Sequence, residues 1–245
     1  RIELTNVTKR WGQFYAVDNL SMVIEDNAFV TLLGPSGCGK TTTLRMIAGL
    51  ETPTSGRILI DGVPVFDSEK GINLPPNKRD IGFLFQNYAL WPHMTVYENI
   101  AYGSEKATRE DVERVCKACG IHDYIRTLPD GYETVLEDDG ANISKGQKQL
   151  MTIARAMLLE SSLLILDEAT SALDTLTESK IQHAFDELAK NRTTLIIAHR
   201  LSTIRDCDCI YVLRGGRIRE QGTHEELMAL GGIYQKLHDM QIKDA

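Results

Sequence analysis

The segment GPSGCGKTT at residues 34–42 limits what this chain can fold into more than any other feature. It follows an apolar run at 29–33 and opens a helix-prone segment at 42–48, so it joins a strand to a helix. Glycines let backbone N–H groups approach an anion closely, and the helix N-terminus adds roughly half a positive charge. The order strand, glycine-rich turn and helix therefore predicts a phosphate-binding loop in an α/β fold.

Two side chains of this phosphate-binding loop suit a nucleoside triphosphate. The ammonium group of Lys40 would reach the β- and γ-phosphates, and the hydroxyl group of Thr41 would bind Mg²⁺. The thiol of Cys38 is expected to be accessible when no nucleotide is bound, so a thiol reagent should then block ATP binding. A glycine turn without a ligand is the alternative, but here a strand and a helix flank the turn in the required order.

Length and charge limit the class of protein. The 245 residues suffice for one large α/β domain with a lobe, or for two small domains. The net charge of −7 disfavours nucleic acid and anionic membrane surfaces as partners. No apolar run approaches the roughly 18 residues that span a bilayer, and no signal peptide is recognised. Because the sequence starts at Arg1, without Met, we expect an excised domain.

The five cysteines, an odd number, indicate reduced thiols in a cytosolic compartment. Cys116 and Cys119 form a CxxC pattern with His122 three residues further on, from which a zinc site could be drawn. The same two cysteines continue the helical spacing of Val112 and Val115, so apolar packing explains them too. Packing is the interpretation that we prefer.

The pattern of apolar residues predicts one α/β core with an inserted lobe. The first 30 residues alternate apolar and polar side chains, as antiparallel strands do. Residues 87–160 are dominated by helix formers and predict a helical lobe. Core strands are expected to return at 163–166, 194–198 and 209–213. Near the end of the chain, Thr223 and Glu226 predict a helix-starting capping box.

The predicted strand at residues 163–166 is continuously apolar and is followed by two acids, Asp167 and Glu168. A buried parallel strand has this composition, and ligands bind at its carboxyl end in open α/β sheets. Asp167 would hold Mg²⁺ through water, and Glu168 would polarise the attacking water as general base. Two solvated acids at a strand end would be the better interpretation without the phosphate-binding loop.

Five further segments resemble the nucleotide-binding domain of ATP-binding cassette (ABC) transporters, and the resemblance covers the whole chain. Residues 143–147 are similar to the signature motif, and 171–174 to the D-loop. Gln86 matches the Q-loop, His199 the switch histidine, and Trp11 the aromatic residue that stacks on adenine. Each match alone is weak, but together with the phosphate-binding loop they occur in the order typical of this family.

The resemblance implies a single domain over residues 1–245 with a P-loop NTPase (RecA-like) core. We expect this core, together with an N-terminal antiparallel β-subdomain, at residues 1–86 and 161–245. The inserted α-helical subdomain, which carries the signature, is expected at 87–160. Such domains bind ATP and Mg²⁺ and hydrolyse ATP.

The resemblance also implies the residues of the site. The catalytic residues would be Glu168, His199, Lys40 and Gln86. The metal ligands would be Thr41, Gln86 and Asp167. The nucleotide would contact Trp11, Val17, Gly34, Ser36, Gly37, Cys38, Gly39, Lys40, Thr41 and Thr42, and from a second copy Ser144, Gly146, Gln147 and Asp174.

In this family ATP hydrolysis drives transport, as in a translocase. Two nucleotide-binding domains, in a homodimer or a heterodimer, close head to tail around two ATP molecules, and a transmembrane domain docks on the helical lobe. The resemblance therefore implies a cytoplasmic domain, peripheral to the inner face of the cell membrane, with no nucleic acid partner.

The two halves of the chain resemble different branches of the family. Residues 1 to about 103 look like the ATPase subunit of maltose-type sugar importers, above all at 34–51, 69–81 and 87–100. Residues from about 107 to 245 look like multidrug or lipid exporters, above all at 128–140, 167–171 and 197–202. We therefore expect a recombined or engineered chimera with its junction at 103–109. A natural, divergent member of the family is the competing account.

The signature departs from the family pattern at Lys145, where a glycine that faces the opposing nucleotide is usual. Lysine adds both bulk and charge, so we expect weak ATPase activity that rises in Lys145→Gly. The alternatives are an engineered chimeric domain with little or no activity and a non-transport ABC ATPase of DNA repair or translation. The latter typically carry a coiled-coil insertion, tandem cassettes or a basic surface, which this sequence lacks. Kinases and GTPases are disfavoured by the ordered motif set.

Overall fold

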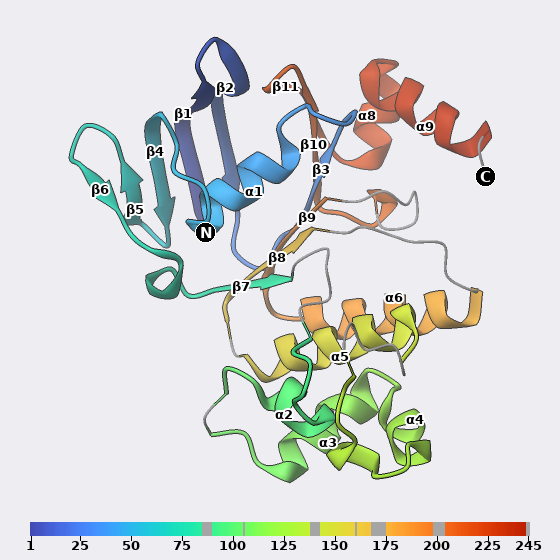
Figure 1. Ribbon diagram of the computed structural model, residues 1–245. Coiled ribbons are helices and arrows are strands. Elements are labelled where there is room, and N and C mark those ends of the chain that lie inside the picture. Colours follow the sequence, from blue (N-terminus) through green and yellow to red (C-terminus); the bar gives the residue numbers. More distant parts are fainter. Residues whose placement is uncertain are drawn as a thin grey trace. The chain divides into compact units, whose positions relative to one another are not determined.

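The computed structural model describes residues 1–84, 90–104, 106–137, 143–159, 161–167, 175–197 and 204–243. The chain forms two compact units. The first comprises residues 1–83, 162–168 and 191–245, and the second comprises 84–161 and 169–190. Figure 1 labels their helices and strands.

Five of the described strands of the first unit form an antiparallel sheet in the order β2-β1-β4-β5-β6 (Figure 1). They are β1 (Ile2–Trp11), β2 (Phe14–Ile24), β4 (Ser55–Ile60), β5 (Val63–Asp67) and β6 (Ile72–Asn73). Alternate residues of β2, among them Leu20, Met22 and Ile24, are buried. The antiparallel strands that the alternating pattern predicted at the N-terminus are thus confirmed.

Six of the described strands form a second sheet in the order β11-β10-β3-β9-β8-β7. They are β3 (Phe29–Leu33), β7 (Ile81–Leu84), β8 (Leu163–Asp167), β9 (Thr193–Ile197), β10 (Cys209–Arg214) and β11 (Arg217–Gly222). The pairs β10–β3, β3–β9 and β9–β8 are parallel, whereas β11 pairs antiparallel with β10. The predicted core strands are therefore present, with β3 between β10 and β9.

Helix α1 (Lys40–Ala48) follows β3 and packs its apolar side into the core of the first unit. Leu44, Met46 and Ile47 are fully buried there, in one cluster with residues of both sheets. The helix begins at Lys40, two residues before the predicted helical segment, with Gly39 as a cap that offers no side-chain acceptor. The backbone N–H groups of its first turn are therefore free of a side-chain cap.

Two helices near the C-terminus, α8 (His224–Leu230) and α9 (Ile233–Lys243), complete the first unit. The predicted capping box at the start of α8 is confirmed, since Thr223 and Glu226 each accept a hydrogen bond from the other's backbone N–H. The carboxylate of Glu220 in β11 accepts hydrogen bonds from the backbone N–H groups of Ile233 and Tyr234. It thereby stabilises the start of α9.

The described part of the second unit is helical. Its helices are α2 (Val96–Ala101), α3 (Arg109–Ala118), α4 (His122–Thr127), α5 (Lys145–Leu158) and α6 (Thr175–Ala189). Thr95, Thr108 and Ser144 begin α2, α3 and α5 with capping boxes. Inside the unit, Arg155 of α5 donates to the backbone carbonyl (2.7 Å) and side-chain oxygen (3.1 Å) of the fully buried Asn99 in α2.

Cys116 and Cys119 are buried in the second unit, together with Val112 and Val115. The described residues contain no group of three or more His, Cys, Asp and Glu side chains that could hold a metal ion. Burial raises the pKa of the Cys116 thiol to about 11 and also raises that of Cys119. The packing interpretation of the CxxC pattern agrees with this arrangement.

Arg79 is a buried cation between the 3₁₀-helix η1 (Pro76–Lys78) and β7. Burial lowers the pKa of its guanidinium to about 10, and no carboxylate of the described chain pairs with it. Its side chain donates to five oxygens: the carbonyls of Met46, Ile47, Leu74 and Val65, and the amide oxygen of Asn73. Two of these acceptors, the carbonyls of Met46 and Ile47, belong to the last turn of α1, where the helix dipole favours a cation.

None of the helices in the described ranges is both long and apolar enough to cross a membrane.

We predict that Arg79→Met lowers the free energy of unfolding by about 3 kcal/mol, because it leaves buried carbonyl oxygens without donors. Urea unfolding at pH 7 measures the change. Arg57→Met is the control, because Arg57 is exposed on β4, and it should change the stability by less than about 0.5 kcal/mol. Equal effects of the two substitutions would contradict the role of Arg79.

Candidate nucleotide-binding site

The phosphate-binding loop lies between β3 and α1, and two of its glycines touch other backbone segments. A Cβ atom on Gly34 would lie 2.3 Å from the carbonyl oxygen of Leu213 in β10. A Cβ atom on Gly39 would lie 2.4 Å from the carbonyl oxygen of Ala16 in β2. Both residues also have positive φ angles, +153° and +102°. Only glycine fits these two positions.

The turn between β10 and β11 holds the loop by a backbone bridge. The N–H group of Gly216 donates to the carbonyl oxygen of Cys38 (3.2 Å), and the N–H group of Asp18 donates to the carbonyl oxygen of Gly216 (2.8 Å). One turn residue thus connects β2 to the phosphate-binding loop. An ion pair between Arg217 and Asp18 (2.7 Å) reinforces the connection.

The ammonium group of Lys40 lies inside the loop. It donates to the carbonyl oxygens of Gly34 (2.7 Å) and Pro35 (3.0 Å), and the residue is only 9% exposed. The positive charge and the uncapped start of α1 therefore act on the same small volume. The contact of Lys40 with the β- and γ-phosphates stays a prediction.

The expectation of an accessible Cys38 thiol was wrong. Cys38 is 3% exposed and belongs to the hydrophobic core cluster of the first unit. Its sulfur would lie 2.7 Å from a Cβ atom added to Gly34. The same sulfur lies 3.6 Å from Lys40 Nζ. The side chain thus packs into the core of the first unit.

The remaining polar residues of the loop face outward. Ser36, Gly37 and Thr41 are exposed, and Thr42 is half-buried. Thr41 lies in the first turn of α1, so its hydroxyl group is open to a ligand at the helix start. Their contacts with a nucleotide stay a prediction.

Strand register places the backbone of Asp167 at the same edge of the sheet as the loop. Asp167 is paired with Ile197, and Ile197 is paired with Leu32, two residues before Gly34. Because strands are spaced about 4.8 Å apart, two strand spacings put Asp167 about 10 Å from β3. Hydroxyl and carboxylate oxygens are the donors that Mg²⁺ prefers, and the roles of Thr41 and Asp167 as its ligands stay predictions.

Trp11 and Val17 lie on the β1–β2 hairpin beside the loop. Val17 is fully buried, and its side chain lies 3.2 Å from the position of a Cβ on Gly39. Trp11 is 49% exposed and stacks with Phe14, which the sequence analysis missed. The signal was present in the sequence, since only Gly12 and Gln13 separate the two aromatic residues, as in a two-residue hairpin turn.

The signature residues belong to the second unit. The hydroxyl group of Ser144 accepts from the N–H group of Gln147 (3.4 Å), and the side chain of Gln147 accepts from the N–H group of Ser144 (2.9 Å). Gly146 is buried and Lys145 is exposed in the first turn of α5. The site residues Gln86, Glu168, Asp174 and His199 lie outside the described residues.

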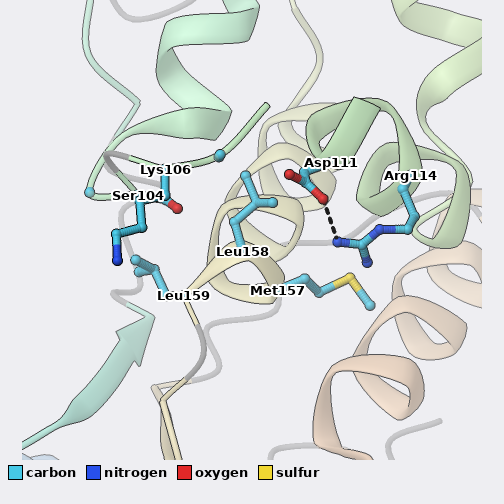
Figure 2. Close-up of a pocket in the computed structure, with 9 residues that line it drawn as sticks. Ser104, Lys106, Asp111, Arg114, Met157, Leu158 and Leu159 are labelled. Atoms are coloured by element: carbon cyan, nitrogen blue, oxygen red, sulfur yellow. Dashed lines mark hydrogen bonds and ion pairs between the residues drawn. The ribbon is translucent and has the colours of Figure 1, made fainter. Parts of the chain in front are cut away.

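The second unit also carries a pocket of about 600 Å³, shown in Figure 2. Met157, Leu158 and Leu159 form its apolar side, and Asp111 and Arg114, joined by an ion pair of 3.1 Å, lie on α3. The pocket continues to the loop after α2. Directly before that loop, exposed Tyr102 packs against exposed Trp91, with ring centroids 5.4 Å apart.

Comparison with known protein families gives a match over residues 17–171 to the family described as ABC transporter. This range is more than half of the chain and includes the phosphate-binding loop, the signature and β8. The chain belongs to the ABC transporter family. It is an ATP-binding domain of a family in which ATP hydrolysis is coupled to transport.

Relatives of this ABC domain include lipid A-core flippases and a fatty acid transporter. An ATP-dependent lipid A-core flippase of Chromobacterium violaceum is 44% identical over 229 residues, which is 94% of this chain and 38% of the flippase. The flippase of Syntrophus aciditrophicus is 42% identical over the full chain and 40% of its own length. A fatty acid ABC transporter ATP-binding/permease protein of Mycobacterium bovis is 45% identical over 90% of this chain and 34% of its own length.

A solved structure shows the same fold for the ABC domain. The structure of a bacterial Atm1-family ABC exporter with ATP bound has a TM-score of 0.87 and 37% sequence identity, covering 98% of this chain. The match spans 41% of that exporter chain. This ABC domain therefore spans about two fifths of the relatives that it matches, and the predicted fold class is confirmed.

We predict that Gly39→Ala costs about 3 kcal/mol of stability and abolishes measurable ATP binding, because the methyl group would overlap the carbonyl oxygen of Ala16. Gly37→Ala is the matched variant: its φ of +75° carries a similar backbone strain, but nothing lies within 4 Å of its Cβ. It should cost about 1 kcal/mol. Thermal unfolding measures the stability of both variants, and calorimetry measures their ATP binding. If Gly37→Ala loses as much stability and ATP affinity as Gly39→Ala, close packing is not the cause.

Proposed function

We propose that this domain binds and hydrolyses ATP and uses ATP-driven, head-to-tail dimerisation to drive transport through a transmembrane domain. The observation that carries this proposal is the placement of Lys40 inside a glycine-shaped loop at the uncapped start of α1. The backbone of Asp167 at the same sheet edge supports it. Transport, substrate and partners belong to the whole protein and stay part of the proposal.

Each residue of the candidate site then has a chemical task. Phosphoryl transfer needs positioning and charge neutralisation more than covalent chemistry. Lys40 and the N–H groups of the loop would neutralise the phosphates, and Thr41 and Asp167 would hold Mg²⁺ together with Gln86. When bound, Mg²⁺ neutralises developing negative charge on the transferred phosphoryl group. Glu168 would polarise the attacking water, and His199 would position the γ-phosphate.

The dimer is supported by the start of α5. Ser144 caps a 14-residue helix whose N-terminus offers backbone donors and a partial positive charge. In the proposed dimer this end faces the γ-phosphate on the other copy, with Gly146 and Gln147 beside it and Asp174 near the same interface. Lys145 adds a full positive charge there, and its bulk opposes close approach.

We predict that Glu168→Gln, which removes the general base, traps an ATP-bound dimer. Light scattering after gel filtration, with and without Mg-ATP, should show a shift from 27.4 kDa to twice that mass. Glu168→Gln with Lys40→Ala is the control, because it removes the phosphate-binding cation and should stay monomeric. A chain that binds no ATP at all would refute the proposed function.

The double variant Glu168→Gln, Lys145→Gly tests the signature. If Lys145 obstructs closure, this variant dimerises at lower ATP concentration than Glu168→Gln alone, and Lys145→Gly hydrolyses ATP faster than the unchanged chain. Equal dimerisation and equal hydrolysis would show that Lys145 does not weaken the site.

The transmembrane partner is proposed to dock on Trp91, Tyr102 and the adjoining pocket, which we term the docking surface. Trp91 and Tyr102 are both exposed and their rings are in contact, and aromatic residues are enriched in interfaces. We infer that the domain works at the inner face of the cell membrane as a peripheral, cytoplasmic part of a transporter.

We predict that Tyr102→Ser uncouples the domain from its partner. This chain would replace the matching region of the Chromobacterium violaceum flippase, and ATPase activity would be measured in liposomes. Tyr102→Ser should lower the activity of this fusion several-fold and leave that of the isolated domain unchanged. Leu230→Ser, which removes a residue 64% exposed on α8, is the control and should change neither. A fusion unaffected by Tyr102→Ser would refute this docking surface.

The chimeric origin remains a narrower proposal. The predicted junction at 103–109 covers most of the connection between α2 and α3 and reaches the first residue of α3, so recombination there would leave the body of both helices intact. The flippases and the fatty acid transporter align with 90–100% of the chain, so the proposal depends on the importer-like segments, above all 69–81 and 87–100. Comparing each half separately tests it: one natural relative that is nearly identical over both halves would refute it.

A further inference from the structure

Trp11 and Phe14 are paired directly across the turn of the β1–β2 hairpin. Their rings are almost parallel, with an interplanar angle of 6° and centroids 6.4 Å apart. Both are strongly exposed, Trp11 by 49% and Phe14 by 60%. Two large aromatic rings held parallel in solvent are apolar surface that a flat ligand could bury.

We propose that Trp11 and Phe14 form a clamp for the base of bound ATP, in which Phe14 supplies a second stacking face. The inference rests on the proposed function, which assigns adenine stacking to Trp11 alone. It adds Phe14 as a residue that determines how tightly the base, and not the phosphate chain, is held.

A base can enter between the two rings, which now stack on each other, only when they part. Aromatic groups stack at about 3.5 Å, so a base in contact with both rings needs them about 7 Å apart. The centroids are 6.4 Å apart, and both side chains are exposed enough to open slightly by rotation about their side-chain bonds. Closing on a base would cover apolar surface that is now in contact with water.

The hairpin also places the clamp within reach of the phosphates. Val17 touches Gly39 of the phosphate-binding loop, and Phe14 lies three residues before Val17 on β2, about 10 Å along the strand. The ribose and the α-phosphate separate the base from the β-phosphate by a comparable span. Figure 1 shows the β1–β2 turn at the upper end of the five-stranded sheet, beyond the start of α1.

Lys9 holds the indole of Trp11 in place. Its ammonium group lies 5.4 Å from the centroid of that ring and is itself fixed by the carboxylate of Glu51 (2.6 Å) and the carbonyl oxygen of Thr52 (2.8 Å). A cation at this distance is attracted by the ring and restricts its rotation. One side of the clamp is thus positioned before a ligand arrives, which lowers the entropic cost of binding.

The neighbouring Tyr15 provides a matched control. It is 45% exposed and pairs with Arg10, one step along the hairpin from the clamp. Because successive residues of a strand point to opposite faces, its ring does not share the face of Phe14. Replacing Tyr15 therefore removes an exposed aromatic ring from the same strand without touching the clamp.

The test is calorimetry of this chain with Mg-ATP and with inorganic triphosphate, which lacks the base. Phe14→Leu should lower the affinity for Mg-ATP by about five-fold to 100-fold, as loss of one stacked aromatic ring does, and leave triphosphate binding unchanged. Phe14→Tyr should retain the affinity for Mg-ATP, because it keeps the ring. Tyr15→Leu should bind both ligands as the unchanged chain does.

Two outcomes would overturn the clamp. One is a Phe14→Leu variant that binds Mg-ATP normally; the other is a loss for triphosphate as large as that for ATP, which would mean that Phe14 only stabilises the hairpin.

Trp11 fluorescence distinguishes failure of the clamp from failure of the proposed function. The chain has two tryptophans, so Trp91→Phe leaves Trp11 as the reporter. Quenching by ATP without any effect of Phe14→Leu refutes the clamp alone, whereas no ATP binding in the unchanged chain refutes both.

Discussion

The close approach of three backbone segments is the constraint on which the nucleotide site depends. Gly39 lies against the carbonyl of Ala16, Gly34 lies against that of Leu213, and Gly216 bridges Cys38 and Asp18 by hydrogen bonds. No side chain fits between these segments, so the loop takes its shape from the strands around it. The position of Lys40 and the open start of α1 follow from that shape.

Local patterns predicted the site where the chemistry is local. Nine consecutive residues specify the phosphate-binding loop, and an apolar run that ends in Asp167 specifies a buried strand. Both signals come from spacing along the chain, which a single sequence shows directly. Strand order then brings them together: parallel strands end at the same edge, and the register between β3, β9 and β8 places Asp167 level with Leu32.

The features that the sequence analysis missed depend on contacts between distant segments. Arg79 resembles any surface arginine in the sequence, but its acceptors come from α1 and from the strands before it. The motif places Cys38 beside a ligand, yet only packing decides which way its side chain points, and it points into the core. Phe14 became visible as a partner of Trp11 only through the pairing across the hairpin.

The bridge through Gly216 has a consequence for the order of events during synthesis. Gly216 follows Cys38 by 178 residues, and β10, which borders β3, ends only at Arg214. A ribosome must therefore complete nearly nine tenths of this chain before the phosphate-binding loop can acquire its final shape. The loop is translated well before the turn that completes it, so ATP cannot assist the folding of the chain until that turn has been made.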